Sequence, residues 1–370
     1  MIDMFKQSSN FILLFFAAII SSCTPPKSFY KMEGSINLRN KINKIIENSE
    51  IDLNMSIQVI SLKHNKVIYD YNSQKLLMPA STNKLYTCAA ALHFLEKDHQ
   101  FGTDVFSDTK NLILKGGGDP DLSIKELDSL ALEVSKKYKN IDTLFIDDTF
   151  LDSLNYGEGW MWDEGPWWYA APISALSVND NCIDFYIKPG PAGEAASIDY
   201  YPKTSFIKLK NESITVQDSV QKRLKIDRDW VLNKNNFNAY GEIIDTSDVD
   251  TLYRNIYDPS TFTGVVFKES LEKYGARVKT ISKKKTSNKS YKKISNHLSK
   301  PLIHSATNLM NESDNLTAEL FVKSIGALDT LPGTWKVGLD SIKSFLAKEV
   351  LIDTSNIRLA DASGVSRYNL

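Results

Sequence analysis

A serine stands three residues before a lysine at the start of an apolar stretch, in the segment Pro79–Ala90 (PASTNKLYTCAA). On a helix, positions i and i+3 share a face, so the Ser81 hydroxyl and the Lys84 amine can meet. A hydroxyl becomes a good nucleophile when a base takes its proton. Lysine serves as that base only if burial and the positive end of the helix dipole lower its pKa. The segment therefore predicts a nucleophile and its activator on a helix whose body belongs to the core.

The Ser-x-x-Lys pattern is short and also arises by chance, and Ser81 would equally serve as an ordinary helix N-cap beside a solvated Lys84. A second motif supports the catalytic interpretation. Ser313-Asp314-Asn315 separates two expected helices. In such a loop the Ser313 hydroxyl can relay a proton, and the Asn315 amide can hold a substrate carbonyl.

The amino terminus has the character of an export signal. Residues 11–20 are an unbroken apolar run, too short to cross a bilayer as a helix, and small residues stand directly before Cys23. This pattern is typical of a bacterial lipoprotein signal peptide, residues 1–23, after which Cys23 is lipidated. A plain secretory signal or a short anchor is the alternative. We expect a protein of the periplasm or cell envelope, held to a membrane through its lipid anchor.

Composition excludes some classes of function. The 370 residues carry a net charge of −1, which argues against a nucleic-acid partner. The five histidines are scattered, and no Cys/His group has metal-ligand spacing, so we expect neither a metal nor another cofactor. The chain is long enough for two or three domains.

Apolar periodicity and turn residues predict an alternation of helices and strands. The helices are expected over 36–48, 124–137, 258–275, 302–311, 315–325 and 335–346, and the strands over 55–62, 67–71, 112–114, 143–146 and 182–187. The lysine-rich stretch 279–293 is interpreted as a solvated hairpin, with attraction to an anionic surface as the alternative. The four tryptophans in 160–168 indicate either sugar stacking or aromatic packing at a domain junction.

Several segments together resemble the D-alanyl-D-alanine carboxypeptidase/endopeptidase family of low-molecular-mass class C penicillin-binding proteins, peptidase family S13. They are 77–84 (LMPASTNK), 116–120 (GGGDP), 169–177 (YAAPISALS), 313–315 (SDN), 332–335 (PGTW) and 361–369 (DASGVSRYN). The matches extend over most of the chain, so chance is an inadequate explanation.

The resemblance implies a mixed α/β (α+β) fold. In this fold a penicillin-binding-protein/β-lactamase-like transpeptidase domain is interrupted by inserted α/β and β-rich domains. On this basis we expect the catalytic domain to occupy residues 24–100 and 256–370, and the inserted domains to occupy 101–255.

The resemblance also implies a serine-type D-Ala-D-Ala carboxypeptidase/endopeptidase that acts on peptidoglycan stem peptides and is acylated by β-lactam antibiotics. Ser81 would be the nucleophile, Lys84 its base, Ser313 the proton shuttle and Asn315 the substrate-binding amide. Two alternatives stay open. One is a β-lactamase or esterase on the same scaffold, and the other is a non-catalytic peptidoglycan-binding surface lipoprotein.

Two segments imitate the motifs in the wrong context. Ser177-Val178-Asn179 repeats Ser-x-Asn but precedes a strand in the inserted region, and Lys285-Thr286-Ser287 resembles a Lys-Thr-Gly motif but lies upstream of Ser313. The sequence contains no Lys-Thr-Gly, and it stops at Leu370, where family members continue into the strand that bears this motif. We therefore expect a C-terminally truncated sequence with an incomplete catalytic domain; the alternative is a natural protein that lacks one wall of its active site.

Overall fold

The computed structural model contains two compact units, residues 1–77 and 78–370. The described residues are 36–49, 54–218, 220–285 and 291–370. The expected signal peptide and Cys23, the expected lipidation site, lie outside them. Within the described stretches, none of the helices combines the length and the apolar character that crossing a bilayer requires.

The described residues of the first unit form a helix and a β-hairpin. α2 spans Ile36–Asn48, β1 spans Ile57–Ser61 and β2 spans Lys66–Tyr71, and the two strands pair antiparallel. Alternating burial along β2 places Tyr69 inward, where its hydroxyl donates a 2.7 Å hydrogen bond to Asn43 Oδ1 on α2. The helix and the hairpin confirm the predicted elements.

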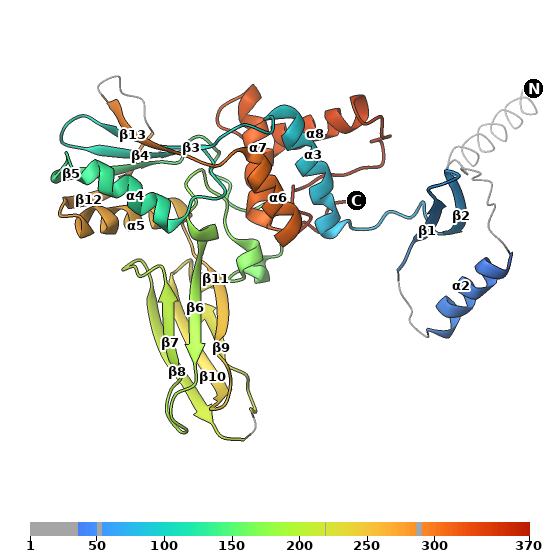
Figure 1. Ribbon diagram of the computed structural model, residues 1–370, viewed down its shortest axis with the longest axis horizontal. Helices are drawn as coiled ribbons and strands as arrows, with labels where there is room; N and C mark the ends of the chain where they lie inside the picture. Colours follow the sequence, from blue (N-terminus) through green and yellow to red (C-terminus); the bar gives the residue numbers. More distant parts are fainter. Residues whose placement is uncertain (1–35, 50–53, 219, 286–290) are drawn as a thin grey trace, which may run out of the picture. The chain divides into compact units, whose positions relative to one another are not determined.

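A five-stranded sheet in the second unit has the order β12-β5-β4-β3-β13. Its strands are β3 (Gly102–Ser107), β4 (Leu112–Gly116), β5 (Asn140–Asp147), β12 (Arg277–Lys283) and β13 (Lys292–Leu298). Helices α4 (Ile124–Ser135) and α5 (Pro259–Lys273) pack on this sheet and against each other (Figure 1). Side-chain caps at Ser123 and Asp258 begin these helices where the sequence predicted them to begin.

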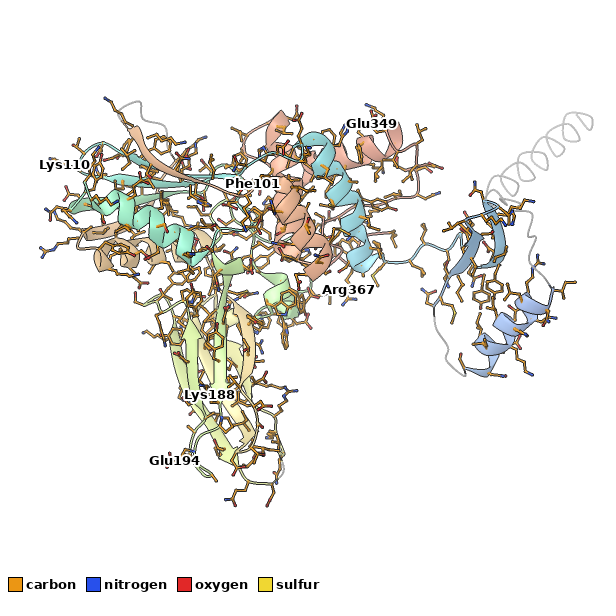
Figure 2. The ribbon with its side chains drawn as sticks, viewed as in Figure 1. Phe101, Lys110, Lys188, Glu194, Glu349 and Arg367 are labelled. Carbon is orange, nitrogen blue, oxygen red and sulfur yellow. The ribbon has the colours of Figure 1, made fainter. Side chains whose placement is uncertain are left out.

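The strand-rich region consists of two three-stranded sheets, β11-β6-β7 and β8-β10-β9. Its strands are β6 (Cys182–Lys188), β7 (Ser197–Tyr201), β8 (Lys208–Val216), β9 (Lys225–Arg228), β10 (Asn236–Ile244) and β11 (Asp250–Asn255). Phe185 and Phe237 join the two sheets, with their ring centroids 5.1 Å apart. Lys188 and Glu194 lie toward the end of this region that is remote from α7 (Figure 2).

Four helices form the layer that positions the site. They are α3 (Lys84–Phe94), α6 (Leu302–Glu312), α7 (Asn315–Asp329) and α8 (Trp335–Lys348). α7 is the centre of this layer, because it contacts α3, α6 and α8 and is buried continuously from Asn315 to Gly326. Phe101, labelled in Figure 2, stacks on Phe321 of α7 at a centroid distance of 6.0 Å and so joins the helices to the start of β3.

The lysine-rich hairpin prediction is wrong. β12 pairs in parallel with β5 and β13 pairs antiparallel with β3, so the two strands lie at opposite edges of one sheet. The sequence suggested that the two strands pair with each other, whereas each pairs with a strand that is distant in the sequence.

The five-stranded sheet joins strands of the expected insertion, 101–255, with strands of the expected catalytic part, 256–370. We therefore propose that the domain boundary lies after β13.

Candidate active site

A tight turn carries the predicted nucleophile. Residues Ala80–Asn83 form a 3₁₀ turn, and α3 begins directly after it at Lys84. In a 3₁₀ turn, side chains at i and i+3 eclipse each other, which brings Lys84 Nζ to 3.1 Å from Ser81 Oγ. Ser81 is exposed, whereas Lys84 is only 2% exposed. A solvent-accessible hydroxyl therefore lies beside a buried amine.

The Lys84 amine has three oxygen neighbours. Besides Ser81 Oγ, its Nζ donates to Asn315 Oδ1 at 2.6 Å and to the Ser363 carbonyl at 2.9 Å. A neutral amine has two N–H groups and one lone pair, so these two acceptors can take both N–H groups and leave the lone pair toward Ser81. After protonation, the third N–H can donate to Ser81 Oγ. The site accommodates both protonation states of Lys84.

Burial lowers the pKa of Lys84, because desolvation disfavours the ammonium form. The charges of Glu319, Asp314 and Asp361 oppose this shift. In the described part of the chain, none of these carboxylates forms an ion pair with Lys84; its partners are neutral oxygens. The electrostatics therefore favour a base rather than a fixed cation.

The second motif occupies the junction of α6 and α7. Ser313 ends α6 in the left-handed conformation (φ 58°), and the Asp314 carboxylate caps α7 by accepting from the backbone N–H groups of Leu316 and Thr317. Asn315 is thereby fixed at the first position of α7, where its Oδ1 accepts from Lys84 and its Nδ2 donates to the Tyr169 carbonyl at 2.7 Å.

The structure therefore brings Ser81, Lys84 and Asn315 together by hydrogen bonds. Among the described residues, the Ser313 hydroxyl makes no hydrogen bond to Ser81 or Lys84, so its role as a proton shuttle stays a prediction. The substrate-binding role of Asn315 also stays a prediction, because both ends of its amide are engaged with the protein here.

The turn Asp361–Gly364 supplies the third partner of Lys84. Asn83 Nδ2 donates to the Asp361 carbonyl at 3.0 Å, and Thr87 Oγ1 donates to the Ala362 carbonyl at 2.7 Å. Together with Lys84, these side chains bind three successive carbonyl groups of the turn. Sequence reasoning missed this role of Asn83 and Thr87, although both follow Ser81 within two turns.

Glu319 holds the same turn from the opposite side. This fully buried carboxylate on α7 accepts from the backbone N–H groups of Ala362 at 3.0 Å and Ser363 at 2.9 Å, and from Trp335 Nε1 at 2.6 Å. Burial and, to a smaller extent, the charge of Asp361 raise its pKa to about 7. Sequence reasoning missed this role of Glu319. The feature that could have indicated it is a single acidic residue inside the mostly apolar stretch 316–322.

Gly364 allows the turn to approach the nucleophile closely. Its φ is +88°, and a Cβ there would lie 1.8 Å from the carbonyl oxygen of Ala80. A larger residue would therefore displace the segment that carries Ser81. Ala80 itself has a φ of 46°, an unfavourable conformation for a residue with a Cβ. The contact fixes the backbone immediately before Ser81.

The imitating motifs lie elsewhere. Ser177 is buried, and its hydroxyl donates to the Ser174 carbonyl within the same loop. This hydrogen bond gives Ser177 a structural role. Thr286 and Ser287 lie outside the described residues. Over those that are described, no group of three or more His, Cys, Asp or Glu side chains could hold a metal ion.

Residues 38–370 match the model of the D-Ala-D-Ala carboxypeptidase 3 (S13) family. The chain is 31% identical over 353 residues to a D-alanyl-D-alanine carboxypeptidase of Actinomadura sp. (strain R39). This alignment covers 90% of the chain and 65% of that relative, so the chain spans just under two thirds of the relative's length.

The fold resembles the crystal structure of penicillin binding protein 4 (dacB) from Haemophilus influenzae, with a TM-score of 0.72 and 25% identity over 85% of this chain and 71% of that chain. The same Haemophilus protein in complex with a novel β-lactam gives a TM-score of 0.67 and 23% identity over 86% and 71% of the two chains. The mixed α/β, penicillin-binding-protein-like fold that the sequence motifs implied is thus confirmed.

Proposed function

We propose that this chain, which belongs to the D-Ala-D-Ala carboxypeptidase 3 (S13) family, is a serine-type carboxypeptidase/endopeptidase that cleaves D-Ala-D-Ala bonds of peptidoglycan stem peptides through an acyl-enzyme on Ser81. The observation that carries the proposal is the 3.1 Å separation of exposed Ser81 Oγ from the buried amine of Lys84. A solvated lysine would be an ammonium ion and could not accept the proton of the serine.

In the first step, Lys84 Nζ takes the hydroxyl proton while Ser81 Oγ attacks the carbonyl carbon of the scissile bond. Negative charge develops on the carbonyl oxygen, where backbone N–H groups, including that of Ser81, would stabilise it. Collapse of this intermediate breaks the C–N bond, and the proton held by Lys84 passes to the departing amine through Ser313. Water then hydrolyses the ester and restores the Ser81 hydroxyl.

A β-lactam would enter the same route. Ser81 Oγ would attack the lactam carbonyl and open the ring, which leaves an ester on the enzyme. The Haemophilus structure in complex with a β-lactam supports this part of the proposal. The substrates lie in the cell envelope, and we propose that Cys23 of the lipoprotein-like leader holds the protein to a membrane there.

Labelling with a fluorescent penicillin tests the proposal. The complete enzyme should gain one covalent adduct, located on Ser81 by mass spectrometry of its peptides, and Ser81→Ala should abolish it. Thr82→Ala is a matched control, because Thr82 is an exposed hydroxyl residue of the same 3₁₀ turn, and it should keep the adduct. Undiminished labelling of Ser81→Ala would contradict the assignment, and rapid release of hydrolysed penicillin would instead indicate a β-lactamase.

A further inference from the structure

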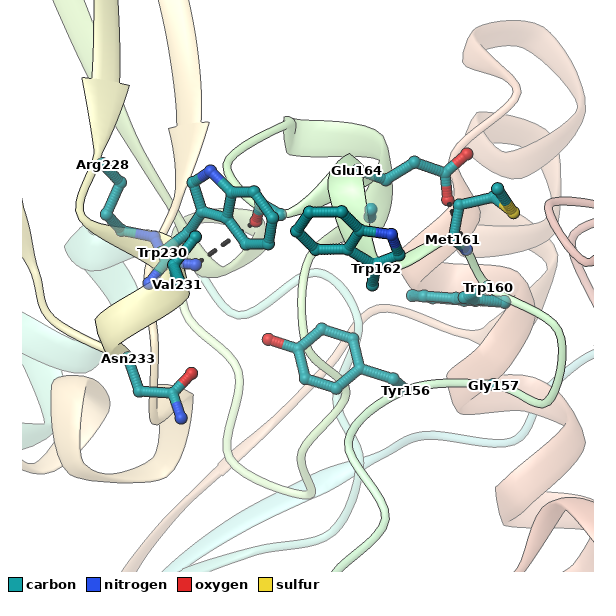
Figure 3. A pocket seen from close by; sticks show the side chains of 12 residues that line it. Tyr156, Gly157, Trp160, Met161, Trp162, Glu164, Arg228, Trp230, Val231 and Asn233 are labelled. Carbon is teal, nitrogen blue, oxygen red and sulfur yellow. Dashed lines mark hydrogen bonds between the residues drawn. The ribbon is translucent and has the colours of Figure 1, made fainter.

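A cavity of about 390 Å³ lies between the segment 156–165 and the end of strand β9. It is formed partly by aromatic side chains and partly by polar ones (Figure 3). Residues that define its character are Tyr156, Trp160, Trp162, Arg228, Trp230 and Asn233. The volume is within the range of about 300–1,000 Å³ that is usual for small-ligand sites.

The Trp162 indole of this cavity is not packed into the core. Trp162 is 74% exposed, and its ring lies 5.2 Å from that of Trp230 with an interplanar angle of 41°. A Cβ on Gly165 would lie 2.2 Å from the Trp230 ring, so this glycine allows the indole to pack on the backbone. Aromatic packing at a domain junction would bury Trp162. Its exposure favours the sugar-stacking alternative of the sequence analysis.

The polar part of the wall contains a buried cation. Arg228 is 3% exposed, and its guanidinium donates to the carbonyl groups of Gly165 and Lys234 and to Asn255 Oδ1. These acceptors are neutral, and no carboxylate of the described residues forms an ion pair with Arg228. The Glu164 carboxylate also lines the cavity, so its polar wall contains groups of both charges next to flat apolar indole faces.

Trp160, which lines the cavity, contacts the turn Asp361–Gly364 that supports Lys84. Trp160 Nε1 donates to Asp361 Oδ2 at 2.9 Å, and the Asp361 carbonyl accepts from Asn83, the residue before Lys84. On another side, Ala170 lines the cavity, and the preceding residue, Tyr169, accepts from Asn315. Two chains of contacts thus connect the wall of the cavity to residues that surround Lys84.

We propose that this cavity binds an N-acetylated hexosamine ring of the glycan strand to which the stem peptide is attached. A pyranose has an apolar C–H face that can stack on Trp162, and its hydroxyl and acetamido groups can face Glu164 and Asn233. The inference deepens the proposed function, because it names the part of the substrate beyond the peptide. A purely apolar ligand would leave the polar wall without partners.

The test uses the N-acetylglucosamine–N-acetylmuramic acid disaccharide without a peptide, titrated against the Ser81→Ala protein by calorimetry and tryptophan fluorescence. We expect saturable binding that Trp162→Ala weakens about tenfold, as the loss of one stacking contact predicts. Trp168→Ala is the matched control, because Trp168 is also exposed (46%) but does not line the cavity, and it should bind as tightly as the parent. Circular dichroism of each variant verifies folding.

No binding of the disaccharide, or equal binding by Trp162→Ala, would overturn the inference. It would also be overturned if a stem peptide without sugar gave the same Trp162-dependent signal, since the occupant would then be the peptide. The two proposals fail separately. Disaccharide binding together with absent penicillin labelling of the unmodified protein would contradict the proposed function and leave the glycan site standing.

Discussion

Two lysines are almost completely buried in the helical layer, and they have opposite surroundings. Lys84 is 2% exposed and contacts neutral oxygens of Ser81, Asn315 and Ser363. Lys323 is 0% exposed, and its Nζ lies 2.6 Å from Asp152 Oδ1 and 3.8 Å from the centroid of the Trp335 ring. Burial lowers the pKa of both amines.

The two lysines differ in the groups that oppose the lowering of their pKa by burial. The Asp152 carboxylate in direct contact favours the ammonium form of Lys323, and the ring face of Trp335 does the same. Lys84 has carboxylates only at longer range, and its third neighbour is an exposed hydroxyl. The comparison teaches that burial alone does not make a lysine a base. A buried lysine functions as a base where its hydrogen-bond partners are neutral and a proton donor is within reach.

The largest expected effect is a difference in acylation rate between substitutions of the two lysines. Lys84→Met should slow acylation by penicillin about 10³-fold, because the hydroxyl proton loses its acceptor. Lys323→Met should leave the acylation rate of the folded protein near that of the parent. Stopped-flow fluorescence with a labelled penicillin measures both rates. Equal losses in the two variants would contradict the comparison.

The same two substitutions should affect the free energy of unfolding in the reverse order. Lys323→Met leaves Asp152 without its ion-pair partner and should lower the free energy of unfolding by about 3–5 kcal/mol. Lys84→Met removes an amine that has no carboxylate in contact, so its loss should be smaller. Urea denaturation followed by circular dichroism compares the two. A larger loss for Lys84→Met would mean that Lys84 is a structural cation.

The amide of Asn315 provides the next test. Asn315→Ala removes the acceptor of the 2.6 Å hydrogen bond that orients the Lys84 amine. Lys84 becomes charged as it takes the proton, and a hydrogen bond to a charged group is worth about 1.5–3 kcal/mol, so acylation should slow about 10- to 100-fold. Asn179→Ala, in the imitating motif, is the control and should acylate at the parent rate. An unchanged rate in Asn315→Ala would exclude the orienting role.

The smallest expected effect concerns Glu319. Glu319→Gln places N–H donors against the backbone N–H groups of Ala362 and Ser363, which should loosen the turn and slow acylation about fivefold.

The pKa of Glu319 is raised to about 7, so the folded state binds the proton more tightly than the unfolded state does. Stability should therefore fall as pH rises from about 4.5 to about 7, and Glu319→Gln should lack this decline.

Local signals in the sequence predicted much of this architecture. The helix 36–48, the hairpin that follows it, and the helices that flank Ser313 all appear in the structure close to their expected bounds. Caps, turn residues and apolar spacing determine such elements within a few residues of chain. For the same reason, Ser81 and Lys84 could be paired from their spacing alone.

Features that depend on distant partners could not be predicted in this way. β12 and β13 join opposite edges of a sheet whose other strands lie far earlier in the chain. β3 was not expected, because polar Thr103 and Ser107 occupy its buried positions. The support of Lys84 by the turn Asp361–Gly364 joins segments 279 residues apart. Periodicity contains no information about such contacts.

The pH dependence of Ser81 acylation tests the central claim most directly. Penicillin labelling rates would be measured from pH 6 to pH 10 under conditions where the protein stays folded. Since the base must be neutral and burial lowers the pKa of Lys84, the rate should rise with pH to a plateau whose midpoint lies below the ordinary lysine value of 10.5. A rate that still rises at pH 10 without approaching a plateau would contradict the assignment of Lys84 as the base.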